Sequence, residues 1–401
     1  MKLNKLSCYF FFIFVINSNI IFCQNNIVNL NNGGINTENY FIKIPYKEIN
    51  GKIIIDVSIN DKGYKFILDT GAPTIITEKL KEEINPNVIG NIEIIDQSGL
   101  KDNVDVVNLF EINIGNLSFN NIPTIVTNDS KILFDCFEVD GYIGSNLLRN
   151  SIIQINAKEK DIIICDNSEI LKIQNKNSKE ILLSHSQSNP FVEIELKKGK
   201  KTIKEKVLID TGDNGFYQIA FSTLEQIKNF KVITFISNSI GSNSFGFNGK
   251  SKDENNFMIN IPILTINNLE LKNVKSKTTY AESSRIGSEI LNLGILTLDY
   301  KNKKINLEPF DEKIETINDN SWQIDAAINK EKLVVGIIWD NDLKNKINLG
   351  DEIISIDSLL IEGMDICQLL KTNFKIKKNK IVLVLKDINT GVLKSIEINK
   401  M

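Results

Sequence analysis

The sequence predicts a mostly β fold in which one small domain occurs twice and is followed by a third, unrelated α+β domain. Short apolar runs alternate with Asn, Gly and Asp, which is typical of strands and turns and leaves few long helical periods. The triplet Asp-Thr-Gly occurs at residues 69–71 and again at 210–212, each time directly after an apolar run. Residues 318–401 match neither copy.

The duplication extends beyond the two triplets. Three further landmarks recur in the same order in both copies: residues 113–122 with 265–274, Tyr142-Ile143-Gly144-Ser145 with Arg285-Ile286-Gly287-Ser288, and Ile155-Asn156 with Leu298-Asp299. The spacing differs only by small insertions. Since this period is too long for a solenoid, we interpret it as two copies of one domain in a single chain, forming a pseudo-dimer.

The domain organisation follows from these landmarks and from composition. The prediction is a signal peptide (1–23), a disordered Asn-rich leader (24–40), a first lobe (41–167), a polar linker (168–190), a second lobe (191–312) and a C-terminal domain (318–401). A short helix is predicted at Thr77–Glu83, with Thr77 as its cap. We expect a monomer with pseudo-two-fold lobes.

The N-terminus has the pattern of a secretory signal peptide. Lys2 and Lys5 precede the apolar stretch Leu6–Phe22, and the chain becomes polar at Gln24. We predict cleavage after Cys23 and a secreted, periplasmic or cell-envelope location. No other apolar run is long enough to span a membrane, so no span is expected after cleavage.

Two alternatives for this segment remain open. Lipidation of Cys23 is disfavoured because Phe22 is bulky where such sites need a small residue. Retention as an anchor is disfavoured by Asn17, Asn19 and the short length of the stretch.

Composition excludes several function classes. The net charge of -3 gives no electrostatic reason for a nucleic-acid partner. His185 is the single histidine and lies in the polar linker, so neither a Ser-His-Asp protease nor a zinc enzyme is expected. We predict no metal and no cofactor.

Three cysteines remain outside the signal region, Cys136, Cys165 and Cys367, an odd number without CxxC spacing. This pattern favours buried, small apolar residues. A Cys136–Cys165 bridge inside the first lobe is the alternative.

The paired motifs resemble the aspartic protease lobe shared by retropepsins and pepsins. The resemblance lies in a hydrophobic run into Asp-Thr-Gly, followed in each lobe by a segment ending in Ile-Gly. It implies that Asp69 and Asp210 form an acid–base pair that shares one proton and activates a water. It further implies support from the neighbouring residues Thr70, Gly71, Thr211, Gly212, Gly144 and Gly287.

One residue departs from this pattern. Asp213 follows Gly212, where the family carries Ser, Thr or Ala, whereas Ala72 follows Gly71. If Asp213 approaches Asp210, a third carboxylate shifts the active range towards neutral pH; if it points to solvent, little changes.

The resemblance also implies a β-hairpin flap over the cleft. Residues 92–107 suit the first-lobe hairpin, with Gln97, Ser98 and Gly99 at its tip. The matching stretch 235–255 is longer and rich in Gly and Ser.

The C-terminal segment resembles a PDZ domain. Residues 347–357, which contain a Gly-Asp turn before an apolar run, carry the resemblance. Residues 366–370 suit the following helix, and 381–386 and 395–398 the closing strands. The resemblance implies a peptide or chain terminus as ligand, although the usual carboxylate-binding loop has no clear counterpart.

Together these patterns predict an aspartic endopeptidase that cuts extended or unfolded polypeptides. The alternative is a non-catalytic envelope protein that binds peptides through its lobes and its PDZ-like domain.

Overall fold

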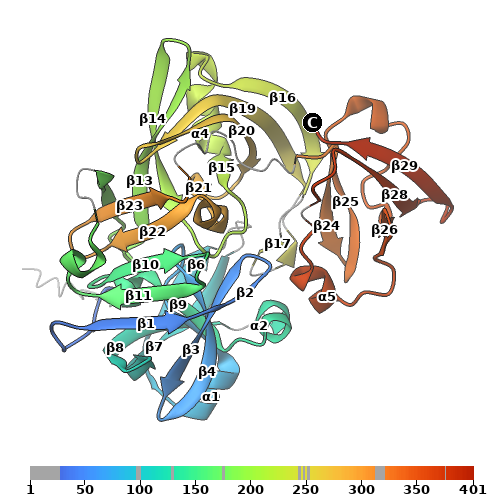
Figure 1. The fold of residues 1–401 in the computed structure, drawn as a ribbon. Helices are drawn as coiled ribbons and strands as arrows, with labels where there is room; N and C mark the ends of the chain where they lie inside the picture. Colours follow the sequence, from blue (N-terminus) through green and yellow to red (C-terminus); the bar gives the residue numbers. More distant parts are fainter. Residues whose placement is uncertain are drawn as a thin grey trace, which may run out of the picture.

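The computed structural model describes residues 28–95, 101–127, 131–173, 177–242, 245–246, 249–250, 253–311, 321–374 and 376–401. It consists of two β lobes, stacked in Figure 1, with the C-terminal domain beside them. The prediction of a mostly β chain with duplicated lobes is confirmed. The PDZ resemblance of the third domain stays a prediction.

The first lobe contains β1 (Phe41–Pro45), β2 (Lys47–Ile49), β3 (Lys52–Ile59), β4 (Lys62–Asp69), β5 (Ile75–Thr77), α1 (Glu78–Ile84), β6 (Asn87–Ile95), β7 (Lys101–Ile114), β8 (Leu117–Thr127), α2 (Lys131–Phe137), β9 (Gly141–Gly144), α3 (Ser145–Leu148), β10 (Ile152–Asn156) and β11 (Asp161–Cys165).

After the 3-10 helix η1 (Ser168–Leu171), the second lobe contains β12 (Lys179–Leu183), β13 (Pro190–Lys198), β14 (Lys201–Ile209), β15 (Tyr217–Ala220), α4 (Phe221–Ile227), η3 (Lys228–Phe230), β16 (Thr234–Gly241), β17 (Phe245–Gly246), β18 (Gly249–Lys250), β19 (Glu254–Ile266), β20 (Leu269–Thr279), β21 (Arg285–Ile286), η4 (Ser288–Asn292), β22 (Gly294–Asp299) and β23 (Lys304–Pro309).

The two lobes share one strand order. The first lobe runs β3-β4-β9-β5-β8-β7-β6 and the second β13-β14-β21-β15-β20-β19-β16. In each, the first strand also pairs with the sixth, β3 with β7 and β13 with β19, which closes the sheet. The sequence repeat is therefore a structural repeat in the order of these strands.

A shared sheet joins the lobes around a pseudo-two-fold axis. Strands β10 and β22 pair antiparallel, with Ile153 opposite Leu298 and Ile155 opposite Leu296. Gln154 pairs with Thr297 between them and donates a 3.1 Å hydrogen bond to its hydroxyl. This exchange of equivalent positions is the pattern of an isologous dimer, reproduced within one chain.

Local sequence signals account for the elements. Helix α1 begins after Thr77, whose hydroxyl accepts a hydrogen bond from the Leu80 N–H at 3.1 Å. Because a capping hydroxyl satisfies one of the free N–H groups of the first turn, the helix starts where the sequence predicts. It ends at Asn85 in the left-handed conformation.

The C-terminal domain is a sheet with one helix. It contains β24 (Ile324–Asn329), β25 (Lys332–Ile338), η5 (Asn341–Leu343), β26 (Glu352–Ile356), β27 (Leu359–Leu360), α5 (Ile366–Lys371), β28 (Lys380–Lys386) and β29 (Leu393–Asn399). The helix and both closing strands occur where they were predicted. Its core is separate from that of the lobes.

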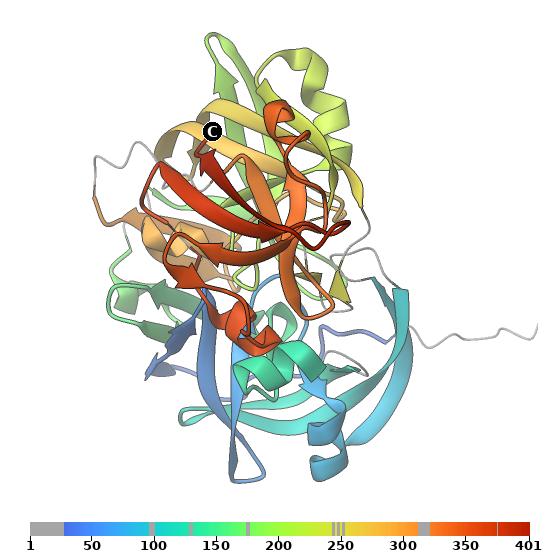
Figure 2. The ribbon, with the colours of Figure 1, turned by 90° about the vertical axis from the view of Figure 1, so that its right-hand side faces the viewer.

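This domain contacts both lobes. On the first lobe, α5 packs against α2, as both ribbon views show, and Lys371 pairs with Glu138 at 3.2 Å (Figures 1 and 2). On the second lobe, Ser237 donates a hydrogen bond to the Trp339 carbonyl at 2.5 Å. The third domain therefore bridges the two halves of the repeat.

The segments predicted as a disordered leader and a polar linker both contain residues that pack or pair with the lobes. Residues 28–40 of the predicted leader include Leu30, 5% exposed, and Gly34, which bridges Asn120. Within the predicted linker, β12 (Lys179–Leu183) pairs with β13 and β23. The short apolar run Ile181-Leu182-Leu183, of which Ile181 is buried, accounts for this strand.

The cysteine expectation is wrong in part. Cys136 of α2 and Cys367 of α5 form a disulfide between the first lobe and the C-terminal domain, 231 residues apart. Cys165 is free and buried, so the alternative Cys136–Cys165 bridge is also wrong. Sequence spacing cannot reveal a bridge between two domains whose docking is unknown.

The predicted signal peptide and its alternatives lie outside the described residues, since the description begins at residue 28. Across the described segments, none of the helices is long and apolar enough to cross a membrane.

Removing the disulfide tests how far it stabilises the chain. Cys136→Ser and Cys367→Ser should each lower the free energy of unfolding by about 2–4 kcal/mol, because an open chain has more unfolded conformations. The double variant should equal either single variant in urea denaturation, and reductant should bring the parent to the same midpoint. Cys165→Ser is the matched control. A urea midpoint of the parent that is the same with and without reductant would contradict the prediction.

Candidate active site

Two equivalent strands deliver the two aspartates. Strand β4 ends at Asp69, and Asp210 follows the last residue of β14. The residues just before each aspartate, Leu68 and Ile209, are almost fully buried. The apolar runs therefore fix each strand in its lobe core, and each aspartate stands where the strand leaves the core.

Two threonines lock the aspartate loops together. Thr70 Oγ1 donates to the Ile209 carbonyl at 2.6 Å and accepts from the Thr211 N–H at 3.0 Å. Thr211 Oγ1 donates to the Leu68 carbonyl at 2.9 Å and accepts from the Thr70 N–H at 3.1 Å. Both threonines are fully buried, so the loops of the two lobes share one closed hydrogen-bond network.

Each aspartate lies against the glycine of the opposite lobe. A Cβ on Gly71 would stand 2.4 Å from Asp210 Cγ, and one on Gly212 would stand 2.2 Å from Asp69 Oδ2. Only glycine fits at these contacts. Each glycine N–H also donates to its own aspartate, at 2.8 Å for Asp69 and 3.1 Å for Asp210.

Burial dominates the electrostatics of Asp69. It raises the pKa of this carboxyl to about 7, and the nearby charge of Asp210 and a hydrogen bond with it act in the same direction. Lys52, which donates to the Gly212 carbonyl, acts in the opposite direction. Asp69 therefore carries its proton over most of the acidic range.

Asp210 has an ionic partner of its own. Arg285 Nη1 lies 2.9 Å from Asp210 Oδ2, and the two side chains are only 10% and 8% exposed. Such a buried pair is held by geometry and hydrogen bonds as much as by charge. The carboxylate form of Asp210 is the form that this contact fits.

Asp213 lies inside the site and not in solvent. Its N–H donates to Asp210 Oδ1 at 3.2 Å, and its own carboxyl accepts from the Gly215 N–H at 2.7 Å. Burial, followed by the charge of Asp210, raises the pKa of Asp213, while Arg285 opposes the rise. Burial, the charge of Asp210 and a hydrogen bond with Asp210 raise the pKa of Asp69. The effect of Asp213 on the active pH range stays a prediction.

The Ile-Gly segments lie beside the aspartate strands in both lobes. Gly144 is opposite Asp69 in the parallel pair β4–β9. In the second lobe, the Gly287 N–H donates to the Phe216 carbonyl at 2.8 Å. Ser145, next to Gly144, donates to the Thr70 carbonyl at 2.7 Å and contacts the Tyr300 hydroxyl of the other lobe at 2.9 Å.

The predicted flap is described in part. Its proposed tip, Gln97, Ser98 and Gly99, lies outside the described residues. The strands on either side, β6 and β7, pair antiparallel from Asn87–Asn108 to Ile95–Lys101. The counterpart in the second lobe is the pair β16–β19.

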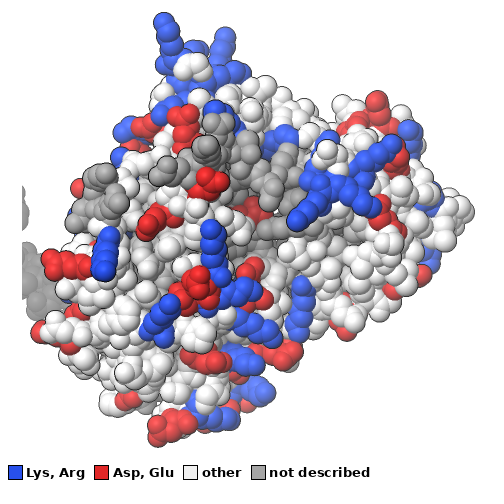
Figure 3. Space-filling model, in the orientation of Figure 1, with Lys and Arg blue, Asp and Glu red and all other residues white. Residues whose placement is uncertain are grey.

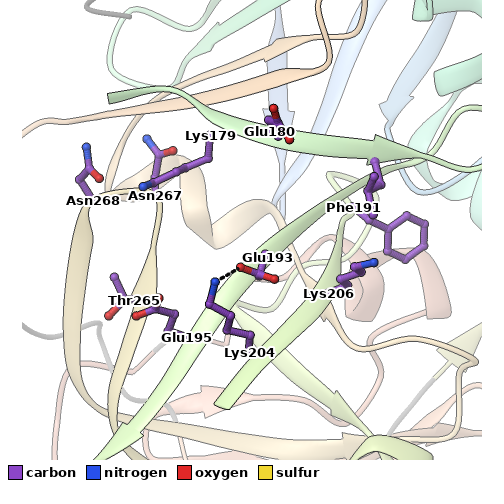
Figure 4. Close-up of a pocket in the computed structure, with 11 residues that line it drawn as sticks. Lys179, Glu180, Phe191, Glu193, Glu195, Lys204, Lys206, Thr265, Asn267 and Asn268 are labelled. Atoms are coloured by element: carbon purple, nitrogen blue, oxygen red, sulfur yellow. Dashed lines mark hydrogen bonds and ion pairs between the residues drawn. The ribbon is translucent and has the colours of Figure 1, made fainter. Parts of the chain in front are cut away.

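A separate groove lies away from the aspartates. It has a volume of about 680 Å³ and lies between β12, β13, β14 and the β19–β20 turn (Figure 4). Lys204 of β14 and Glu193 of the neighbouring strand β13, which both line it, form an ion pair at 2.7 Å. None of the aspartate-loop residues lines it, and its mixed charges select no single ligand class.

Neither the surface charge nor the grouping of metal-binding side chains indicates a further site. Acidic and basic side chains are interspersed over the face in Figure 3. Among the residues that the structure describes, no group of three or more His, Cys, Asp or Glu could hold a metal ion.

The sequence interpretation missed the contacts of Arg285 and Lys52 in the site. Arg285 was visible as the one charged residue in the paired Tyr-Ile-Gly and Arg-Ile-Gly segments. Its charge, next to a second-lobe aspartate, was the available signal. Lys52 reaches Gly212 from the start of β3, and no motif indicates this contact between lobes.

The threonine network makes a stability prediction. Thr70→Val and Thr211→Val should each lower the free energy of unfolding by about 1–3 kcal/mol, because each leaves a buried N–H and a buried carbonyl without a partner. The double variant should fall short of additivity in urea denaturation, since the two hydroxyls form one network. Thr70→Ser, which keeps the hydroxyl, is the control; strict additivity would count against a shared network.

Asp69 makes a prediction about pH. The folded protein holds this proton up to a pKa of about 7, well above the ordinary value of 3.8, so rising pH between these values destabilises the folded state. The stability of Asp69→Asn relative to the parent should therefore increase from pH 4 to pH 7. Asp56→Asn, an exposed change in the same lobe, should show no such trend, and a flat difference for Asp69→Asn would refute the raised pKa.

Part of the chain is similar to known proteins. The family described as "Aspartyl protease" matches residues 55–147, most of the first lobe. A retropepsin-like aspartic protease from Rickettsia conorii is a similar solved structure, with 19% identity over 32% of this chain and 90% of its own, and a TM-score of 0.24. No curated protein matches the chain. The family match and the duplicated strand order together give the lobes an aspartic protease fold.

Proposed function

We propose that the protein is an aspartic endopeptidase in which Asp69 and Asp210 activate a water molecule. The observation that carries this proposal is the meeting of two carboxyls, one from each lobe, on a backbone locked by two buried threonines. One carboxyl holds a proton up to about pH 7, and the other lies in a contact that fits the carboxylate. An acid and a base side by side are what water attack on a peptide bond requires.

The proposed substrate is an extended or unfolded polypeptide that lies between the lobes. The two long hairpins, β6–β7 and β16–β19, support this proposal because each lobe supplies one at an equivalent position. A peptide must be extended to reach both aspartates and both lobes. We further propose that the C-terminal domain binds a peptide or a chain terminus, and that the protein works outside the cytoplasm, where its disulfide persists.

A second candidate is a peptide-binding protein without catalysis. The Arg285 contact favours it, since Arg285 takes up one oxygen of Asp210. A statine-type transition-state mimic distinguishes the two candidates, because only an assembled acid–base pair binds such a mimic much more tightly than the matching peptide.

Substitution of either aspartate tests the proposal directly. Cleavage of an unfolded protein by the chain from Gln24 onward, measured between pH 3 and pH 8, should fall at least about 10³-fold in Asp69→Asn and in Asp210→Asn. Activity of the parent should decline as pH rises through about 7, because Asp69 must keep its proton.

Asp56→Asn is the matched control and should keep full activity. Activity that survives either dyad substitution would refute the mechanism. A folded parent that cleaves nothing at any pH would favour the binding protein.

A further inference from the structure

The duplicated backbone gives the two carboxyls different neighbours at equivalent positions. Tyr142 stands opposite Ile67 in the parallel pair β4–β9, and Arg285 stands opposite Leu208 in the parallel pair β14–β21. Both positions lie one residue before the Ile-Gly pairs that match in the repeat. Asp69 therefore lies near an uncharged phenol, and Asp210 lies against a guanidinium.

Two further positions near the aspartates also differ between the lobes. Ile75 is opposite Tyr142, whereas Gln218 is opposite Arg285. Ala72 follows the first Asp-Thr-Gly, whereas Asp213 follows the second.

These second-lobe residues form one polar cluster. Gln218 Nε2 lies 3.3 Å from both carboxyl oxygens of Asp213, and Arg285 bonds to Asp210. Three uncharged positions of the first lobe thus carry Arg, Gln and Asp in the second. All three lie on the Asp210 side of the pair.

The other charged and titratable groups around the pair do not all act in the same direction. Lys52, from β3, lowers the pKa of Asp69 and that of Asp213. Tyr142 and Tyr300 also face Asp69, and burial and the Asp69 charge raise the pKa of both phenols, which therefore remain neutral. Arg285 is a cation in direct contact with Asp210, at 2.9 Å.

We propose that Arg285 is a positioning residue that fixes the roles of the two aspartates: Asp210 stays the carboxylate that accepts a proton from the attacking water, and Asp69 stays the acid. This deepens the proposed function and rests on it. In a symmetric pair either carboxyl can hold the shared proton. Here a 2.9 Å contact between two nearly buried side chains selects one arrangement.

The fixed roles give a balanced reaction. The water oxygen bonds to the peptide carbon while one water proton moves to Asp210 and the Asp69 proton moves to the carbonyl oxygen. Asp210 then gives its proton to the leaving nitrogen as the C–N bond breaks. Asp69 takes a proton back from a hydroxyl of the diol, which leaves a carboxylic acid and an amine and restores the pair.

A titration that needs no turnover tests the proton assignment. The chain from Gln24 onward, labelled with ¹³C at the Asp carboxyl carbons, would be followed from pH 3 to pH 8. Asp69→Asn and Asp210→Asn assign the two signals. At pH 5 we expect the Asp69 carbon at the shift of a neutral acid and the Asp210 carbon at that of a carboxylate. Two signals averaged between these shifts in the parent would overturn the proposal.

Three variants show whether Arg285 is responsible. Arg285→Tyr installs the residue that the first lobe carries, and it should move the two signals towards each other. Arg285→Lys, which keeps the charge, should preserve the separation seen in the parent. Tyr142→Phe, at the equivalent position in the first lobe, is the matched control and should leave both signals in place. Should the Tyr variant fail to fold, Arg285→Gln replaces it; a separation that persists in either neutral variant would overturn the proposal.

Kinetics then separate this proposal from the proposed function. In Arg285→Tyr, kcat/KM at pH 4.5 relative to pH 6 should fall about tenfold, because loss of the cation removes the contact that favours the carboxylate form of the base. A purely structural role would lower both rates by the same factor and would contradict the proposal. A parent without activity would refute the proposed function, while the titration would still decide where the proton lies.

Discussion

Every part of the site depends on the closed hydrogen-bond network of Thr70 and Thr211. Each hydroxyl satisfies one N–H and one carbonyl of the opposite lobe in a region without solvent. Unpaired backbone groups at this depth would be costly. The lobes can therefore neither slide nor separate locally without exposing four polar groups. This constraint holds the two carboxyls together although like charges repel.

A symmetric backbone carries an asymmetric electrostatic environment. The pseudo-two-fold axis relates the threonines to each other and Gln154 to Thr297. The charged side chains do not follow this symmetry, because Arg285 and Asp213 have the uncharged counterparts Tyr142 and Ala72. Duplication within one chain allows this difference, since two identical subunits would have to carry the same residue on both sides.

The duplicated, mostly β lobes could be predicted because their patterns occur twice, and the helix after Thr77 because its capping residue is a local signal. The aspartate loops were also visible, as short motifs at strand ends. Other features depend on how distant segments dock. The Arg285–Asp210 pair, the reach of Lys52 to Gly212 and the Cys136–Cys367 bridge each join groups far apart in sequence. The PDZ resemblance and the catalytic roles stay predictions.

The bridge between α2 and α5 has a consequence for the order of assembly. Its two cysteines are 231 residues apart, so Cys136 emerges from the ribosome long before Cys367 exists. The whole second lobe must be made, and the C-terminal sheet begun, before the bond can form. The first lobe must therefore keep a reduced thiol through most of synthesis, and closure of the bond marks a chain that is nearly complete.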